Sequence, residues 1–300
     1  MSDRLLVVDK PEGPTSHDVV ARVRRATGIR RVGHAGTLDP RASGVLLVLV
    51  GRATRLSAYL MERDKSYRGR MTLGVTTDTQ DSEGEVIERK DASAVTREDI
   101  EHAAAGFVGD IMQVPPMVSA IKRDGTPLYE LARKGVVIER EARPVSVHEL
   151  RITGYEPPYV DFILDCSKGT YVRTIAADLG DRLGCGAHLS MLVRTRVGPF
   201  GLDLAVPLAS IVKAGSGWEE LGIRPVDALP DMDIVLLDES QAESTMDGGS
   251  AELGEEQRTK ATTERVLLTE DGETLLAVAR VARANGTARV RPEKVFVPPI

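Results

Sequence analysis

The residue types best suited to chemistry lie in one short segment near the N-terminus. The segment runs Gly33-His34-Ala35-Gly36-Thr37-Leu38-Asp39-Pro40. Its glycines permit tight backbone turns and close approach of a ligand, and Pro40 keeps Asp39 out of helical dihedral angles and stiffens the loop. A carboxylate held at a fixed place can act as a nucleophile that forms and releases a covalent adduct. The alternative is an ordinary Asp-Pro surface turn followed by a core strand.

Arginines are concentrated just upstream of this loop, and they are Arg22, Arg24, Arg25, Arg30 and Arg31. The chain as a whole has a net charge of −6, yet residues 1–70 hold 14 Lys/Arg against 7 Asp/Glu. Residues 71–228 hold 17 against 24, and residues 229–300 hold 8 against 14. Because local potential governs phosphate binding, the basic N-terminal quarter permits an RNA partner. A solvated helix face is the alternative for any one of these arginines.

Metal ligands and cysteines are few and widely spaced. The five histidines form no metal-binding pattern, and Cys166 and Cys185 form neither a metal-ligand pair nor a disulfide framework. We therefore expect no metal, no cofactor and a reducing, cytoplasmic setting. The N-terminus does not resemble a signal peptide. The longest apolar run, Val45 to Val50, is too short to cross a bilayer, so no membrane partner is expected.

Strands and helices that would position the loop follow one another along the first 200 residues. Arg4 to Asp9 predicts a strand, and Thr15 or Ser16 can cap a helix that ends at Gly28. A loop over 33–43 then leads into a buried strand. Further strands are predicted over 66–74, 146–155 and 160–166, and helices over 52–62, 97–107, 127–134 and from Thr170 to near Gly184. The pattern favours an α+β fold with a mixed, largely antiparallel sheet and flanking helices.

The sequence pattern changes near Leu229, from alternating strands and helices to short β-like runs. Short β-like runs follow at 234–237, 266–269, 275–279, 288–290 and 295–297. The polar stretch from Asp238 to Thr263 is expected to be mobile. Three hundred residues suit one large domain and a smaller one. We therefore expect a catalytic domain over residues 1–228 and a small β-rich domain over residues 229–300.

The Asp39 segment and several others match the motifs of one protein family in order and spacing over about residues 5–200. They are Lys10-Pro11-x-Gly13-x-Thr15-Ser16, Gly33-His34-x-Gly36-x-Leu38-Asp39-Pro40-x-Ala42-x-Gly44, Lys65-x-Tyr67, Thr76-x-Asp78-Thr79-x-Asp81-x-x-Gly84, Gln113-x-Pro115-Pro116, Gly169-Thr170-Tyr171-x-Arg173-Thr174 and Leu192-x-Arg194-Thr195. Together they resemble the TruB family of pseudouridine synthases, bacterial enzymes that act on uridine 55 in the T loop of tRNA. Two positions depart from that family. Thr126-Pro127 replaces a basic residue that could touch RNA, and Arg41 replaces a neutral residue and could add a phosphate contact.

The resemblance implies a pseudouridine synthase fold followed by a PUA-like, RNA-binding tail. It implies isomerisation of uridine 55 to pseudouridine by base flipping, with Asp39 as nucleophile, Arg173 as its bidentate partner and Tyr67 stacking on the base. The tyrosine hydroxyl could also move a proton at C5. The further substrate-binding residues implied are Lys10, His34, Tyr171, Leu192 and Arg31. The partner would be the tRNA T arm without a guide RNA, and the protein would be a monomer.

The sequence leaves several alternatives open. Asp39 could attack ribose C1′ or base C6, or the reaction could pass through a glycal. Lys10 could hold its turn or take part in catalysis. Rival functions are an RNA-folding factor that remodels tRNA without chemistry, a guide-RNA-dependent synthase that needs partner subunits, and an Asp-nucleophile hydrolase. The hydrolase would need a base or oxyanion motif, which the segments above do not supply. A folding activity could also accompany synthesis.

Overall fold

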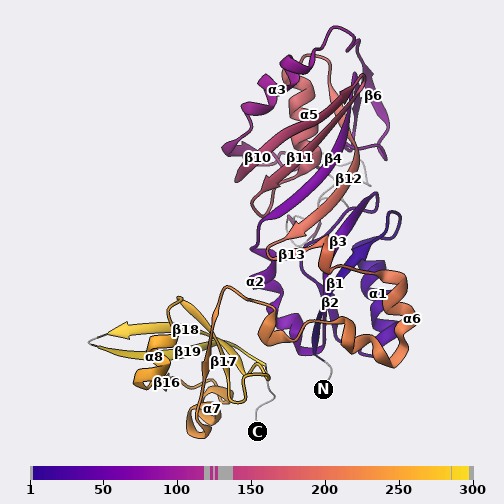
Figure 1. The fold of residues 1–300 in the computed structure, drawn as a ribbon. Helices are drawn as coiled ribbons and strands as arrows, with labels where there is room; N and C mark the ends of the chain where they lie inside the picture. Colours follow the sequence, from indigo (N-terminus) through magenta and orange to yellow (C-terminus); the bar gives the residue numbers. More distant parts are fainter. Residues whose placement is uncertain (1–2, 118–121, 124–125, 128–137, 285, 297–300) are drawn as a thin grey trace.

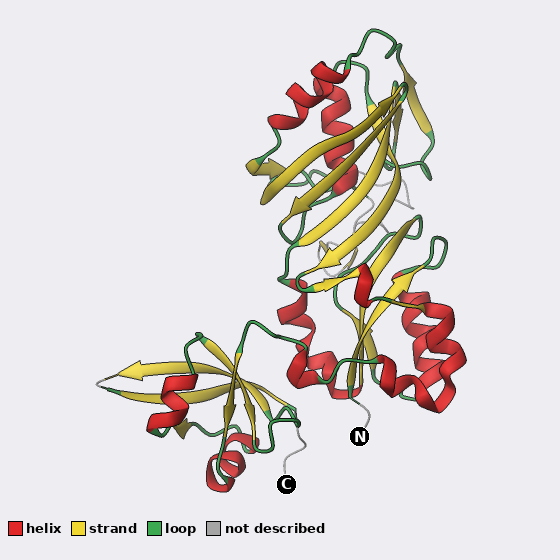
Figure 2. Ribbon diagram, in the orientation of Figure 1, coloured by secondary structure: helices red, strands yellow, loops and turns green. Residues whose placement is uncertain are grey.

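The computed structural model describes residues 3–117, 122–123, 126–127, 138–284 and 286–296. Within these residues, ten strands form one large sheet (Figures 1 and 2). Its order is β14-β1-β3-β12-β4-β11-β10-β7, with β2 added to β3 and β13 to β12. The strands are β1 (Arg4–Lys10), β2 (Val32–His34), β3 (Ala42–Val50), β4 (Lys65–Leu73), β7 (Gly109–Gln113), β10 (Arg143–Glu156), β11 (Tyr159–Cys166), β12 (Ala187–Val197), β13 (Phe200–Gly201) and β14 (Val206–Pro207).

The pairings within this sheet are antiparallel except for two. The strand β14 runs parallel to β1, and β12 runs parallel to β3. The expected α+β fold with a mixed, largely antiparallel sheet is therefore confirmed. The second parallel pair brings the end of the Asp39 loop against a strand that lies about 150 residues later, with Ala42 opposite Leu192.

Both faces of β1 and β3 are buried, which explains their uninterrupted apolar sequences. Alternate side chains such as Leu6 and Val48 pack with α1 (Ser16–Thr27) and α6 (Leu208–Ala214). The opposite face, including Leu47, packs with η1 (Gly51–Leu56) and α2 (Ser57–Met61). The other half of the sheet is covered by α3 (Arg97–Ala105) and α5 (Val172–Arg182), as Figure 1 shows.

The helix α1 begins and ends as its sequence predicts. Thr15 accepts a hydrogen bond from the backbone N–H of Asp18, and the Asp18 carboxylate accepts one from the N–H of Thr15. This reciprocal cap supplies partners for N–H groups that the first turn leaves unpaired. Gly28 ends the helix with a φ of 70°, a conformation that favours glycine.

The loop before the buried strand is shorter than expected. Residues 33–43 were predicted as loop, but β2 occupies 32–34 and the buried strand begins at Ala42 instead of Val45. The segment predicted as one helix over 52–62 is split between η1 and α2, and the helix expected from Thr170 begins at Val172. The expected helix over 127–134 lies outside the described residues, apart from Pro127 in β9 (Thr126–Pro127).

The strand β12 was missed by the sequence analysis. It crosses the middle of the sheet between β3 and β4. Its pairing with β4 shifts register between Leu189 and Met191 and again between Arg194 and Arg196. Because each bulge adds a residue, the two-residue alternation that marks a strand is broken twice within eleven residues.

Smaller elements complete this part of the chain. They are β5 (Val75–Thr77), β6 (Val86–Arg89), β8 (Lys122–Arg123), β9 (Thr126–Pro127), η2 (Leu202–Leu204), η3 (Gly215–Leu221) and η4 (Pro225–Asp227). The described residues contain no helix that is both long enough and apolar enough to cross a membrane.

The tail forms a second sheet, whose described strands run in the order β15-β17-β18-β19-β16. The strands are β15 (Asp233–Leu236), β16 (Ala251–Glu252), β17 (Arg265–Thr269), β18 (Ala277–Ala284) and β19 (Thr287–Val295). The expected β-rich tail is therefore confirmed. The polar stretch expected to be mobile instead holds α7 (Glu239–Met246) and α8 (Glu255–Lys260). Asp238 and Gln241 form a reciprocal cap on α7, a local signal that the lack of apolar periodicity had obscured.

One apolar cluster joins the tail to the large sheet. Leu267, Val278 and Phe296 from the tail are buried with Leu60 and Leu229. An ion pair between Arg63 and Asp231 (2.5 Å) lies at the same junction. The tail is thus packed against its neighbour through apolar contact, and the boundary at residue 229 stays a prediction.

Candidate active site

The Asp39 loop is held mainly through its backbone. The hydroxyl of Ser16 accepts a hydrogen bond from the N–H of Leu38 and donates one to the carbonyl of Leu38, both at 2.9 Å. The N–H of Gly13 donates to the carbonyl of Pro40 at 2.8 Å. Leu38 is buried, whereas the Asp39 side chain is 43% exposed. The loop therefore fixes the carboxylate at a set position while leaving it open to a substrate.

Arg173 lies directly against this carboxylate. Its Nε is 3.1 Å from Oδ2 of Asp39, and its side chain is only 5% exposed. Its Nη1 is 3.3 Å from Oδ2 of Asp81 and donates to the carbonyl of Thr79 at 3.1 Å. These contacts with two carboxylates and a carbonyl offset the free-energy cost of removing the guanidinium from water. Asp39 is the more exposed of the two carboxylates, so it is the one that a substrate can reach.

Hydrogen bonds to Gln113 and Gln80 hold the first turn of α5, which carries Arg173. The amide of Gln113 donates to the carbonyl of Tyr171 (3.1 Å) and accepts from its N–H (2.7 Å). The Thr174 hydroxyl donates to Gln80 Oε1 at 2.9 Å. Gln113 and Asp81 were quoted as motif residues, but no role was inferred for them. Their positions support the Asp39–Arg173 pair from two sides.

Lys10 lies behind the loop and has no exposed surface. Its Nζ donates to the carbonyls of Pro11 (2.9 Å), Pro40 (3.1 Å) and Ala42 (2.7 Å). Burial lowers the pKa of Lys10 to about 8. An ammonium group has three N–H donors, and these carbonyls account for all of them. This geometry favours a role in holding the turn over a direct part in catalysis.

Arg194 is a second buried cation that binds the loop backbone. Its Nε donates to the carbonyl of Val45 (2.7 Å), Nη1 to that of Thr37 (3.1 Å) and Nη2 to that of Gly36 (3.1 Å). The close pairing of β3 and β12 requires glycine at position 44, because a Cβ there would lie 2.3 Å from the carbonyl oxygen of Arg194. Arg194 was quoted as a motif residue, but no role was inferred for it from the sequence.

Tyr67 and Leu192 meet beside this loop. Tyr67 on β4 pairs with Arg194 on β12, and its ring is buried in one apolar cluster with Leu38 and Leu192. Burial raises the pKa of Tyr67, the charge of Arg194 opposes the rise, and the charge of Asp39 adds a smaller increase. The phenol is therefore neutral near pH 7. The structure brings Asp39, Tyr67, Leu192 and Arg173 into one region.

His34 ends β2 at the start of the loop. Its ring lies edge-on to that of His17, with centroids 5.4 Å apart and an interplanar angle of 87°. Its Nδ1 is buried and has no hydrogen-bond partner among the described residues. Burial lowers the pKa of His34 to about 4, with smaller effects from His17 and Arg194. The imidazole is therefore neutral near pH 7.

The upstream arginines are exposed, as their proposed role requires. Arg31 donates from Nε to the hydroxyl of Thr54 at 2.6 Å. Arg24 is partly used by the fold, because it donates to the carbonyls of Arg30 and Val32. Arg41 pairs with Glu12 at 2.9 Å and with Glu83 at 3.5 Å. It would have to exchange these partners to make the extra phosphate contact suggested by its sequence position.

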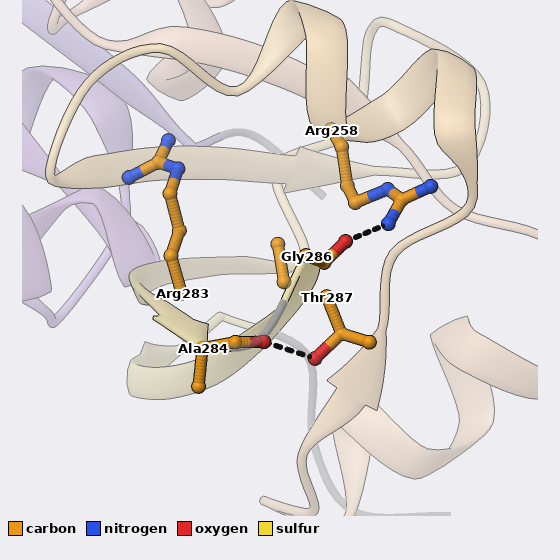
Figure 3. A pocket seen from close by; sticks show the side chains of 6 residues that line it. Arg258, Arg283, Ala284, Gly286 and Thr287 are labelled. Atoms are coloured by element: carbon orange, nitrogen blue, oxygen red, sulfur yellow. Dashed lines mark hydrogen bonds between the residues drawn. The ribbon is translucent and has the colours of Figure 1, made fainter.

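A surface hollow of about 320 Å³ lies in the tail, away from these residues. Arg258 and Arg283 flank it at the tip of the β18–β19 hairpin (Figure 3). Arg258 donates to the carbonyl of Gly286, and Arg283 donates to that of Ala261. Across the described part of the chain, no group of three or more His, Cys, Asp or Glu side chains is arranged to hold a metal.

Two family models match consecutive parts of the chain. The TruB family pseudouridylate synthase model (N terminal domain) matches residues 24–172, and the tRNA pseudouridylate synthase B C-terminal domain model matches residues 173–229. With the mixed sheet and the Asp39 loop, they define the chain as a pseudouridine synthase, which is an isomerase. The chain belongs to the TruB family. Neither model extends beyond residue 229, so the PUA-like assignment of the tail stays a prediction.

Individual relatives agree with this assignment. The chain is 52% identical over 251 residues to tRNA pseudouridine synthase B of Symbiobacterium thermophilum, covering 82% of each protein. It is 44% identical over 298 residues to the enzyme of that name from Burkholderia pseudomallei, covering 98% of this chain and 97% of the relative. Among solved structures, a chain in a Cbf5-Nop10-Gar1 complex matches with a TM-score of 0.74 and 26% identity, over 98% of this chain and 85% of that one.

Proposed function

We propose that this protein converts uridine 55 in the T loop of tRNA to pseudouridine, with Asp39 as the nucleophile. The observation that carries the proposal is the Asp39–Arg173 pair, in which a half-exposed carboxylate lies 3.1 Å from a buried guanidinium. Relatives with 44–52% identity named tRNA pseudouridine synthase B support tRNA as the substrate. The unpaired thiols of Cys166 and Cys185 agree with a reducing, cytoplasmic setting.

The proposed reaction breaks one carbon–nitrogen bond and forms one carbon–carbon bond, and the nucleotide neither gains nor loses atoms. The bond between ribose C1′ and base N1 breaks, the base turns, and a bond forms between C1′ and C5. The C5 proton leaves and N1 gains one, so the product is an isomer. Attack by Asp39 at C1′, its attack at C6, and a glycal route all require an ionised carboxylate close to the nucleotide.

The residues around Asp39 suit an extruded uracil. Tyr67 offers an aromatic face for stacking, and its neutral hydroxyl is available for proton transfer at C5. Leu38 and Leu192 supply apolar surface beside it, while Tyr171 precedes Arg173 at the start of α5. Arg173 supplies the counter-charge of the nucleophile and orients its carboxylate.

Base extrusion costs a few kcal/mol, which the protein must repay with contacts of its own. His34 is neutral and aromatic, so it can stack in the space that the uracil leaves. Exposed arginines of α1 and the following turn, including Arg31, can bind the phosphates of the T arm. Because a flipped base loosens the loop, a tRNA-folding activity would accompany the chemistry.

The function is tested with purified protein and an unmodified tRNA transcript, without other proteins or RNAs. We expect one pseudouridine, at position 55, mapped by carbodiimide labelling and primer extension. A transcript with cytidine at that position should stay unmodified. No conversion would favour the guide-RNA-dependent class, and conversion elsewhere would overturn the site assignment. Light scattering during the assay should give the mass of a monomer.

We also propose that residues 229–300 form a PUA-like domain that binds RNA. Deleting them would uncover Leu60 and Val226 in the shared apolar cluster, so a deletion would confuse binding with stability. Substitution of the two arginines beside the tail hollow is the cleaner test. Arg258 on α8 is partly exposed and Arg283 on β18 is exposed, and both line the hollow, where they can meet phosphates.

Replacing Arg258 and Arg283 together with Gln should weaken binding of full-length tRNA by about three- to tenfold and lower the slope of log affinity against log salt by about 2. Binding of a short T-arm hairpin should be unchanged. Arg97→Gln, which removes an exposed arginine paired with Glu101 on α3, is the matched control. An equal loss on tRNA and hairpin would contradict a separate role for the tail.

A further inference from the structure

Arg194 is a buried charge whose position serves more than packing. Its side chain is among the largest that are fully buried, and the hydrogen bonds described above go to main-chain carbonyls. Taking a guanidinium out of water is costly, and a well-packed apolar side chain is often the more stable choice at a buried position. Retention of the charge therefore points to a task that requires an oriented cation.

The geometry of the guanidinium links the loop to the sheet. Nε binds the carbonyl of Val45 on β3, whereas Nη1 and Nη2 bind the carbonyls of Thr37 and Gly36. Thr37 lies two residues before Asp39. Because the donors of one guanidinium share a rigid plane, these bonds set the distance between the loop and β3. They thereby set how far Asp39 stands from the sheet.

The same side chain also contacts the aromatic residue of the site. Tyr67 and Arg194 are directly paired across β4 and β12, and the phenol lies within the electrostatic influence of the guanidinium, whose charge opposes the rise that burial causes in its pKa. We propose that Arg194 is a positioning residue that fixes the Asp39 carboxylate and the Tyr67 hydroxyl relative to each other. The inference rests on the proposed function, because it assigns both groups to one reaction.

The conservative variant Arg194→Lys tests this proposal. Lysine keeps the charge but presents a single nitrogen, so it cannot span the carbonyls of Gly36, Thr37 and Val45 with one planar fork. A displacement of about 1 Å at a reacting group can cost about 10²-fold in rate. We expect the single-turnover rate of pseudouridine formation to fall by about that factor, with tRNA affinity within about threefold of the parent.

A double-mutant cycle with Tyr67→Phe separates positioning from general destabilisation. If Arg194 acts partly through the tyrosine hydroxyl, Arg194→Lys should cost much less in the Tyr67→Phe background than in the parent. Arg63→Lys is the matched control, because Arg63 is also largely buried and ion-paired but lies at the tail junction. It should lower the thermal midpoint without changing the rate.

Each outcome either supports or overturns the positioning role of Arg194. A parental rate in Arg194→Lys, or fully additive effects in the cycle, would overturn the proposal. Arg194→Gln is the second variant, which keeps donors without the charge. If neither variant folds, Arg194 serves stability and the proposal fails. A parent protein that converts no uridine would instead refute the proposed function, so the two failures are distinguishable.

Discussion

Asp39→Asn is expected to abolish pseudouridine formation, with a fall in single-turnover rate on the order of 10⁴-fold or more, as for loss of other enzymic nucleophiles. The amide has nearly the same shape as the carboxylate but cannot act as the nucleophile. The loop should keep its conformation, because Lys10, Ser16 and Arg194 hold it through backbone groups. Affinity for tRNA should stay within about threefold, since phosphate contacts dominate binding.

The matched control for this variant is Asp161→Asn. Asp161 is also paired with an arginine, Arg70 at 2.7 Å, but the pair lies on the exposed surface of β4 and β11. It should leave the rate unchanged. Retained conversion in Asp39→Asn would refute the assignment of the nucleophile. If the inactive variant still promotes tRNA folding, the folding activity is separate from the chemistry.

Arg173→Met should have the second largest effect, a fall in rate on the order of 10²–10³-fold, because removing one partner of a buried charge pair costs about 2–5 kcal/mol. The 43% exposure of the Asp39 side chain places this pair toward the lower part of that range. The variant leaves the carboxylates of Asp39 and Asp81 without their shared cation. Asp39 loses both its counter-charge and its orientation. Since the Arg173 side chain is 5% exposed, it offers little surface to RNA phosphates, and tRNA affinity should change little. Rate and affinity are measured on the same tRNA transcript.

Two further variants sharpen that test. Arg173→Lys restores a charge but not the planar fork, so its rate should fall between those of the parent and the methionine variant. Arg70→Met removes an arginine from an exposed pair and should change the rate by less than about twofold, as expected for surface ion pairs. A rate near the parental value in Arg173→Met would show that Asp39 does not depend on this guanidinium.

Local signals made much of the fold predictable. The cap at Thr15 and the glycine at position 28 gave the limits of α1, and uninterrupted apolar residues marked β3. The strand β12 was not predictable in the same way, because its bulges disrupt the alternation on which strand prediction relies. The helices of the polar tail stretch were missed because they are short and carry little apolar periodicity.

The sequence predicted the site residues whose side chains are expected to act on the substrate. It did not predict the roles of residues whose side chains bind the backbone of the site. The structure brings Asp39 and Arg173 to within 3.1 Å of each other, while their catalytic roles stay predictions. Arg194 and Gln113 were part of quoted motifs, but their roles were not inferred because they bind main-chain groups. Any residue has such groups, so sequence letters carry no mark of these contacts.

The parallel pairing of β3 with β12 has a consequence for how the molecule is made. Ala42 cannot meet Leu192 until the later residue has left the ribosome. At roughly 5–20 residues per second, translation of the intervening chain takes on the order of ten to thirty seconds. During that interval β2 already pairs with Val48 to Val50 of β3, but Ala42 to Gly44 lack their neighbour β12, and an unpaired strand edge is prone to aggregate. A nascent chain that stops before β12 therefore lacks the strand that joins β3 to β4 and the Arg194 contacts that hold the Asp39 loop.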